Sequence, residues 1–188
     1  MKKNIVILIS GRGSNLESII SATKKKNFPA KISLVISSNK SALGLKIAEK
    51  NHIKNFAVEQ KEFSNKELFE SDLIGKIAQQ DPSLICLAGF MQILSKKFIN
   101  KFKDKIINIH PSLLPDYKGL NTHERVIQAG ERYSGCTVHY VTEELDGGKI
   151  IAQERILISP SDTPKTLSRK VLEREHIIYP KTIESLLS

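Results

Sequence analysis

Short apolar runs alternate along this chain with longer segments whose apolar residues recur every three or four positions. The runs are almost continuous, as in strands that are buried on both faces of a parallel sheet. They occupy residues 4–10, 31–38, 55–59, 83–89 and 105–110. The segments with helical spacing between them occupy residues 14–26, 42–51, 65–80 and 95–103. This alternation predicts an α/β fold with a mostly parallel, twisted sheet and helices on both faces.

The spacing within these helices also predicts which side chains are buried. In the first helix the apolar stripe comprises Leu16, Ile19, Ile20 and Thr23. In the third helix it comprises Leu68, Leu73, Ile74 and Ile77. We expect both stripes to face the sheet.

The pattern changes after Pro115. A short helix is followed by two strand-like runs joined by the sequence EELDGG, which predicts an antiparallel hairpin near the C-terminal part of the chain. A long final helix follows, and Pro180 is expected to bend or split it. These segments are residues 123–130 (helix), 135–142 and 149–159 (strands) and 163–188 (final helix). No repeat, low-complexity segment or linker interrupts the pattern, so we expect residues 1–188 to form a single domain.

The composition is that of a globular protein. The 188 residues are 40% hydrophobic and 26% charged, which suits one domain with its own core. No apolar run approaches the ~20 residues that span a membrane, and the apolar run that ends at Ile9 is too short for a secretory signal. The two cysteines, Cys86 and Cys136, lie in apolar runs with neither disulfide nor metal-ligand spacing. We therefore expect a cytoplasmic protein.

The net charge of +9 changes this picture only slightly. The lysines are spread along the chain, there is no tryptophan, and the basic runs 24–26 and 95–98 lack the interleaved aromatic residues typical of nucleic-acid-binding surfaces. We interpret the charge as a solvated surface that helps to attract small anions, without a nucleic-acid partner.

The sequence SGRGSNL, residues 10–16, joins the first strand to the first helix and is rich in glycine. It does not complete a dinucleotide fingerprint, because Leu16 stands where the third glycine would be, and it lacks the Lys-Ser or Lys-Thr pair of a P-loop. A small phosphate site remains, with Gly13 allowing close approach and Ser14 and Asn15 as donors. Alternatively, Ser14 or Asn15 caps the helix in an ordinary tight turn.

Polar side chains interrupt the fifth strand at its carboxyl end. Because side chains alternate along a strand, Asn108 and His110 share one face, opposite Ile107 and Ile109. In open α/β sheets ligands bind at these strand ends. An amide and an imidazole that converge on one oxygen can stabilise an oxyanion. An acid is needed to orient the histidine, and the hairpin connection supplies three candidates, Glu143, Glu144 and Asp146.

No nucleophile is evident, because the cysteines lie in apolar strands and no serine stands in a G-x-S-x-G motif. This favours direct acyl transfer between two bound substrates. Among the remaining histidines, we interpret His123 as lining the site, His139 as a strand-face residue, and His52 and His176 as surface residues. No pair of histidines has metal-ligand spacing, so we expect no metal.

Four motifs together resemble the folate-dependent phosphoribosylglycinamide formyltransferases, which belong to a wider formyltransferase superfamily. They are ISGRGSNL (9–16), LAGFMQIL (87–94), NIHPSLLPDYKG (108–119) and VHYVTEELDGGKII (138–151). The resemblance is collinear over nearly the whole chain. It implies a Rossmann-like formyltransferase fold and transfer of a formyl group from 10-formyltetrahydrofolate to the amine of glycinamide ribonucleotide.

The resemblance also implies roles for individual residues. The catalytic residues of the family correspond to Asn108, His110 and Asp146. The residues expected to bind the ribonucleotide are Gly13, Ser14, Asn15 and Glu175. Those expected to bind folate are Lys66, Met91, Gln92, Ile93, Leu94, Asn108, Thr142, Glu143, Glu144, Leu145 and Asp146. Lys66 stands where relatives commonly have an arginine. We expect a monomer or a homodimer with small-molecule substrates and no membrane partner.

Three alternatives share some of these features. A formyltetrahydrofolate deformylase has the same catalytic residues and uses water as the acceptor, but those enzymes usually carry an N-terminal regulatory domain, for which the first strand at Asn4 leaves no room. A methionyl-tRNA formyltransferase usually has a C-terminal tRNA-binding domain, for which the chain ends too soon. A phosphate-binding module without catalysis accounts for the glycine loop but leaves Asn108, His110 and Asp146 without a purpose.

Overall fold

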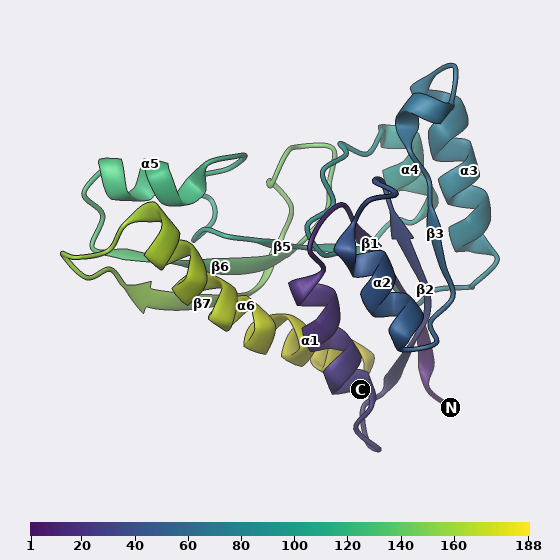
Figure 1. The fold of residues 1–188 in the computed structure, drawn as a ribbon, viewed down its shortest axis with the longest axis horizontal. Coiled ribbons are helices and arrows are strands. Elements are labelled where there is room, and N and C mark those ends of the chain that lie inside the picture. Colours follow the sequence, from purple (N-terminus) through teal and green to yellow (C-terminus); the bar gives the residue numbers. More distant parts are fainter.

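A single mixed sheet contains all seven strands of the computed structural model, which describes residues 1–188. The strand order is β3-β2-β1-β4-β5-β6-β7 (Figure 1). The strands are β1 (Lys3–Ile9), β2 (Ala30–Ser37), β3 (Asn55–Ala57), β4 (Leu84–Leu87), β5 (Ile106–His110), β6 (Tyr133–Tyr140) and β7 (Ile150–Leu157). Strands β1 to β5 are parallel, whereas β6 and β7 are antiparallel additions. The predicted mostly parallel sheet with a C-terminal hairpin is confirmed.

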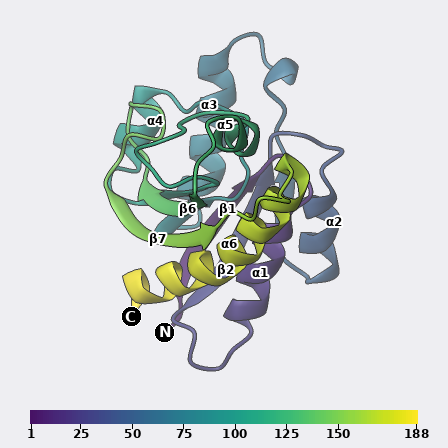
Figure 2. The same ribbon diagram turned by 90° about the vertical axis from the view of Figure 1, so that its left-hand side faces the viewer.

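Helices cover both faces of this sheet. They are α1 (Ser14–Thr23), α2 (Leu43–Lys50), α3 (Lys66–Ala78), α4 (Lys96–Lys101), α5 (Thr122–Gln128) and α6 (Pro164–Leu187), with a short 3-10 helix, η1 (Gln60–Glu62), that the spacing did not predict. Helix α6 runs beside α1 and brings the C-terminus close to the N-terminus (Figure 2). The Lys3 ammonium donates to the Leu187 carbonyl at 2.7 Å, which joins the two ends of the chain. No helix is both long and apolar enough to cross a lipid bilayer.

Two hydrophobic cores explain why the strands are continuously apolar. In β1, Ile5, Ile7 and Ile9 pack into the core beneath α1 and α6. The alternate residues Val6 and Leu8 pack into the core beneath α3 and α4. Each central strand therefore buries both of its faces and needs an apolar residue at nearly every position.

Two details differ from the prediction. Leu68 is 51% exposed, and Phe69 takes the buried position in α3, because the buried stripe follows Phe69, Leu73 and Ile77 in steps of four residues. Helix α6 is not split at Pro180 but continues to Leu187. Neighbouring side chains, including Tyr179 and Ile183, are buried in the core and hold the helix across the proline.

The order of the strands reverses at β1, which pairs with β2 on one side and with β4 on the other. The connections that follow β1 and β4 therefore leave the sheet toward opposite faces and open a crevice at the carboxyl ends of the strands. Strand β5 ends beside this crevice with His110, and the next residues include a cis peptide bond between Leu114 and Pro115.

Gly13 ends the loop after β1 in a left-handed conformation, with φ of 81°. A Cβ atom at this position would lie 2.6 Å from the Cα atom of Gly44 in α2. Gly75, by contrast, lies exposed inside α3, where a Cβ atom would meet nothing.

We predict opposite effects of alanine at these two glycines. Gly13→Ala should lower the free energy of unfolding by about 1–3 kcal/mol through backbone strain and the clash with α2. Gly75→Ala should raise it by about 0.5–1 kcal/mol, since alanine is the better helix former. Urea unfolding of both variants tests this, and an unchanged stability of Gly13→Ala would contradict it.

Candidate active site

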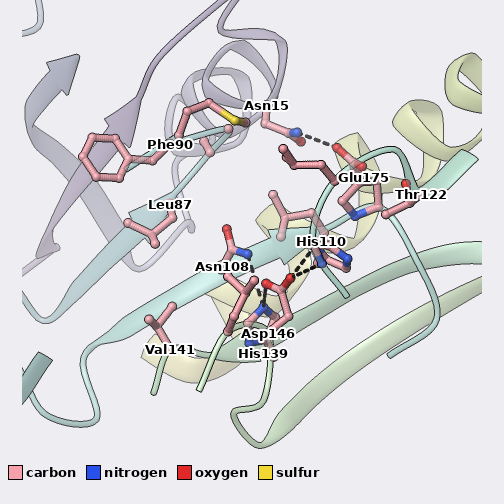
Figure 3. Close-up of a pocket in the computed structure, with 18 of the residues that line it drawn as sticks. Asn15, Leu87, Phe90, Asn108, His110, Thr122, His139, Val141, Asp146 and Glu175 are labelled. Carbon is pink, nitrogen blue, oxygen red and sulfur yellow. Dashed lines mark hydrogen bonds and ion pairs between the residues drawn. The ribbon is translucent and has the colours of Figure 1, made fainter. Parts of the chain in front are cut away.

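The crevice at the carboxyl edge of the sheet contains a cavity of about 1020 Å³, which is large enough for two small molecules side by side. It is lined by the loops after β1, β4 and β5, by the connection between β6 and β7, and by one side of α6 (Figure 3). The predicted site residues that line it are Gly13, Ser14, Asn15, Met91, Gln92, Ile93, Leu94, Asn108, His110, Thr142, Glu143, Glu144, Leu145, Asp146 and Glu175. Lys66 does not line it; its ammonium lies on α3, 3.9 Å from the Glu70 carboxylate.

His110 is buried at the end of β5 with a partner for each ring nitrogen. Its Nε2 lies 3.0 Å from the Tyr117 carbonyl oxygen, and because a carbonyl only accepts, this nitrogen carries a proton. Its Nδ1 lies 3.4 Å from an Asp146 carboxylate oxygen. A doubly protonated ring thus finds an acceptor at both nitrogens. The Nδ1 contact is longer than an ordinary hydrogen bond, so this nitrogen is also accessible to a ligand.

Of the three acids in the hairpin connection, only Asp146 reaches the histidine. Its carboxylate also accepts a hydrogen bond from the Gly119 amide at 2.9 Å, which fixes it beside His110. Glu143 instead pairs with Lys96 at 3.3 Å, and Glu144 pairs with Lys118 at 2.6 Å. These two pairs join the connection to α4 and to the segment after β5.

Asn108 is oriented by His139, a residue that the sequence led us to assign to an ordinary strand face. His139 Nδ1 lies 2.8 Å from the Tyr140 carbonyl oxygen and must carry a proton. Burial lowers the pKa of His139, so the ring is neutral near pH 7 and its Nε2 is an acceptor. The Asn108 amide nitrogen donates to this Nε2 at 3.2 Å (Figure 3). One amide N–H is thereby held, and the other remains for a ligand.

The pairing of strands explains why this residue was missed. His139 lies directly opposite Asn108 in the β5–β6 ladder. Antiparallel pairing with β5 is a long-range contact that local spacing does not reveal. The only local signal was that His139 lies seven residues before Asp146, in the same hairpin.

A second polar group lies at the other end of the cavity. The Asn15 amide nitrogen donates to a Glu175 carboxylate oxygen at 2.7 Å, and both side chains are buried (Figure 3). Burial raises the pKa of Glu175, although the hydrogen bond from Asn15 opposes this. The Asn15 side-chain oxygen has no partner.

The first turn of α1 lies at the same end. Gly13 is its N-cap residue, and no side chain caps the helix, so the alternative of a turn capped by Ser14 or Asn15 is wrong. Uncapped backbone N–H groups at a helix start attract an anion. The Arg12 side chain also lines this end of the cavity.

The other histidines and the two cysteines differ in burial and in their distance from the cavity. His123 lines the cavity as predicted, and burial lowers its pKa. His52 is exposed, whereas His176, which we expected at the surface, is half-buried. Burial raises the pKa of the Cys136 thiol to about 12, and Cys86 is fully buried as well, so neither is a reactive nucleophile. No group of three or more acidic, histidine or cysteine side chains is arranged to hold a metal ion.

Exposed apolar side chains also belong to the lining of the cavity. Met91, Ile93 and Leu145 are each more than half exposed and line the cavity. Leu120 also lines it and is exposed. Exposed apolar groups around a concave opening are typical of a site that covers a flat, partly apolar ligand.

A sequence model of formyl transferases matches residues 3–183 of this chain. The chain belongs to the formyl transferase family. Within it, the chain is 46% identical to phosphoribosylglycinamide formyltransferase of Haemophilus influenzae, an alignment that covers 97% of this chain and 86% of the relative. It is 39% identical to the enzyme of the same name from Escherichia coli, over 96% of this chain and 85% of the relative.

This formyl transferase also matches a segment of larger proteins. It is 44% identical to the trifunctional purine biosynthetic protein adenosine-3 of Gallus gallus, over 100% of this chain and 19% of that protein. The chain therefore spans about a fifth of the length of that relative.

Solved structures agree with the assignment. The crystal structure of phosphoribosylglycinamide formyltransferase from Brucella melitensis superposes with a TM-score of 0.97 at 41% identity, covering 100% of this chain and 97% of that one. The enzyme from Coxiella burnetii, solved in complex with CHES, superposes with a TM-score of 0.95 at 47% identity, covering 100% and 88%. The sequence and the fold of this formyl transferase are thus similar, over nearly the whole chain, to those of phosphoribosylglycinamide formyltransferases.

Because the pKa of Glu175 is raised in the folded state, the ionised carboxylate costs stability. The stabilisation by the protonated form is fully present below the pKa of the unfolded chain and is lost as the pH rises through the folded pKa. We predict that Glu175→Gln is more stable than the wild type at pH 8 and that this difference disappears near pH 4. Glu173→Gln, at an exposed position of the same helix, is the control for the loss of one carboxylate from α6. Urea midpoints across this pH range give the measurement; a constant difference for Glu175→Gln would contradict the prediction.

Proposed function

We propose that this chain transfers the formyl group of 10-formyltetrahydrofolate to the amine of glycinamide ribonucleotide in purine biosynthesis, forming N-formylglycinamide ribonucleotide and tetrahydrofolate. The observation that carries the proposal is the arrangement of Asn108, His110 and Asp146 midway along one cavity. One N–H of the Asn108 amide is free for a ligand, the Nδ1 atom of His110 has no close hydrogen bond, and Asp146 lies beside the histidine.

The two ends of the cavity suit the two substrates. We assign the phosphate of the ribonucleotide to the uncapped start of α1, at Gly13, Ser14 and Asn15, and its ribose hydroxyls to Glu175. We assign the folate ring system to the end formed by residues 91–94 and 142–146. The hydrogen-bonded pair of Asn15 and Glu175 beside the uncapped start of α1 supports a polar, anionic ligand there. The exposed apolar residues Met91, Ile93 and Leu145 in the cavity lining support contacts to a ring system. We do not include Lys66 among the folate contacts, because it lies outside the cavity lining.

The proposed reaction is a direct transfer through a tetrahedral intermediate. The substrate amine attacks the formyl carbon. The free amide N–H of Asn108 and the Nδ1–H of protonated His110 donate to the oxygen on which negative charge develops. The new C–N bond to the ribonucleotide forms as the tetrahedral carbon is created. The bond to the folate N10 then breaks, and the proton lost by the amine passes to that nitrogen. Asp146 holds His110 and accepts the proton in transit through water.

The proposed reaction uses no nucleophilic side chain of the protein. Both cysteines are buried on the far side of the strands or among apolar residues, and neither lines the cavity. The formyl group is therefore transferred without a covalent formyl-enzyme intermediate.

We further propose that residues 1–188 act as one domain in a reducing, cytoplasmic compartment, as a monomer or homodimer. The single sheet and the two free, buried cysteines support this. Light scattering coupled to gel filtration measures the oligomeric state.

One assay tests the reaction. Purified protein is given 10-formyltetrahydrofolate with and without glycinamide ribonucleotide, and the release of tetrahydrofolate is followed. Release that depends on the ribonucleotide supports the proposal. Release into water alone supports a deformylase, and no release supports a binding module.

In this assay we predict that Asn108→Ala and His110→Ala each lower turnover by about 10²–10³, since each removes one donor to the developing oxyanion. Both proteins should remain folded by circular dichroism. His52→Ala, at an exposed position, is the control and should retain wild-type turnover. Near-normal turnover of either purified site variant would overturn the assignment of these residues.

We predict a smaller effect at His139, because it acts through Asn108. His139→Phe removes the acceptor that holds the Asn108 amide, and we expect turnover to fall by roughly 10- to 100-fold with little change in KM. His139→Gln keeps an acceptor oxygen and should recover part of this loss. Equal turnover of the two variants would show that the acceptor does not matter.

A further inference from the structure

The hydroxyl of Tyr179 lies between the ends of two strands that border the cavity. It is within hydrogen-bond distance of the Leu87 carbonyl oxygen in β4, at 2.9 Å, and of the Ile107 carbonyl oxygen in β5, at 3.2 Å. Tyr179 is fully buried, and burial raises the pKa of its hydroxyl well above the ordinary value, so the group remains a donor. It does not line the cavity and cannot touch a substrate there.

These two carbonyl groups mark the point where β4 and β5 separate. The last paired residues of the two strands are Leu87 and Asn108. The next residue, Ala88, donates its amide to the Leu8 carbonyl of β1, on the other side of β4. A hydroxyl that contacts both carbonyl groups at the end of the β4–β5 pairing links the ends of the two strands.

The Ile107 carbonyl belongs to the peptide group whose nitrogen is that of Asn108. The orientation of this peptide plane sets the direction in which the Asn108 side chain leaves the strand. Ile107 and Tyr179 pack in the core beneath α1 and α6, whereas Asn108 points into the cavity. Tyr179 therefore supports Asn108 from behind the sheet, while His139 orients its amide from the front.

Helix α6 supplies a second link to the cavity. Glu175 precedes Tyr179 by four residues and lies on the same side of the helix. Its carboxylate accepts the hydrogen bond from Asn15 in the first turn of α1. Helix α6 thus contacts both the first turn of α1 and the strand that carries Asn108.

We propose that Tyr179 is a positioning residue for formyl transfer, whose hydroxyl fixes the end of β5 so that the Asn108 amide points at the formyl oxygen. This inference rests on the proposed function. Turnover then depends on the buried Tyr179 hydroxyl, although this group touches neither substrate.

Tyr179→Phe keeps the ring and removes the hydroxyl. We expect turnover to fall by about 10- to 100-fold, as for a misplaced catalytic group, while KM for both substrates stays within about twofold. Thr182→Val removes another buried hydroxyl from α6, one that donates to the Ile178 carbonyl of the same helix, and it should leave turnover unchanged. Tyr179→4-aminophenylalanine restores a donor and should recover turnover.

A double-mutant cycle separates positioning from general loss of stability. If Tyr179 acts through Asn108, Tyr179→Phe should have no further effect on turnover in an Asn108→Ala background. Should Tyr179→Phe fail to fold, Tyr179→4-fluorophenylalanine, which fills the space of the hydroxyl and cannot donate, takes its place in the cycle.

Multiplicative losses in the double variant, or unchanged turnover of the folded single variant, would overturn the inference. These outcomes are distinct from failure of the proposed function, which would appear as absence of ribonucleotide-dependent release by the wild-type protein.

Discussion

The contact between His110 and the Asp146 carboxylate is the interaction on which the site depends. The two residues are separated by 36 positions in the chain and come within 3.4 Å of each other. Their approach requires β6 to pair antiparallel with β5 and the hairpin connection to fold back over the end of β5. The segment after β5 supplies one hydrogen bond to each partner: the Gly119 amide donates to Asp146, and the Tyr117 carbonyl accepts from His110.

Polar groups behind these residues restrict the freedom of the site. Asn108 has neighbours on two sides, the His139 ring in front and the peptide group beside the Tyr179 hydroxyl behind. A half-buried amide with one N–H engaged presents the other in a defined direction, which suits a site that must stabilise charge as it develops. Preorganisation of this kind requires the rigid sheet, because a mobile loop would have to be ordered at each turnover.

Much of the architecture could be predicted from the chain. Unbroken apolar runs predicted the buried parallel strands, because a strand covered on both faces has no solvent-facing position. Alternation along β5 predicted that Asn108 and His110 share a face, and both line the cavity. Helical spacing was less reliable in α3, where Leu68 is exposed and Phe69 is buried, because several registers of the same apolar residues fit a helix nearly as well. Pro180 carried a strong local signal for a break, and core packing of α6 overrode it.

The sequence by itself determined the order of strands and helices, the pairing of an amide with an imidazole at a strand end, and the family motifs. Spacing alone left three acids as possible partners of His110, and the family motifs indicated Asp146. The tertiary structure gives the physical reason, because Asp146 lies beside His110 while Glu143 and Glu144 pair with lysines. The sequence did not indicate the roles of His139 and Tyr179. His139 contacts Asn108 across two paired strands, and Tyr179 lies 71 positions after Asn108, in helix α6. Periodicity describes how one element meets the core, whereas the site is made of contacts between elements, which only the pairing register and the packing of the whole chain decide.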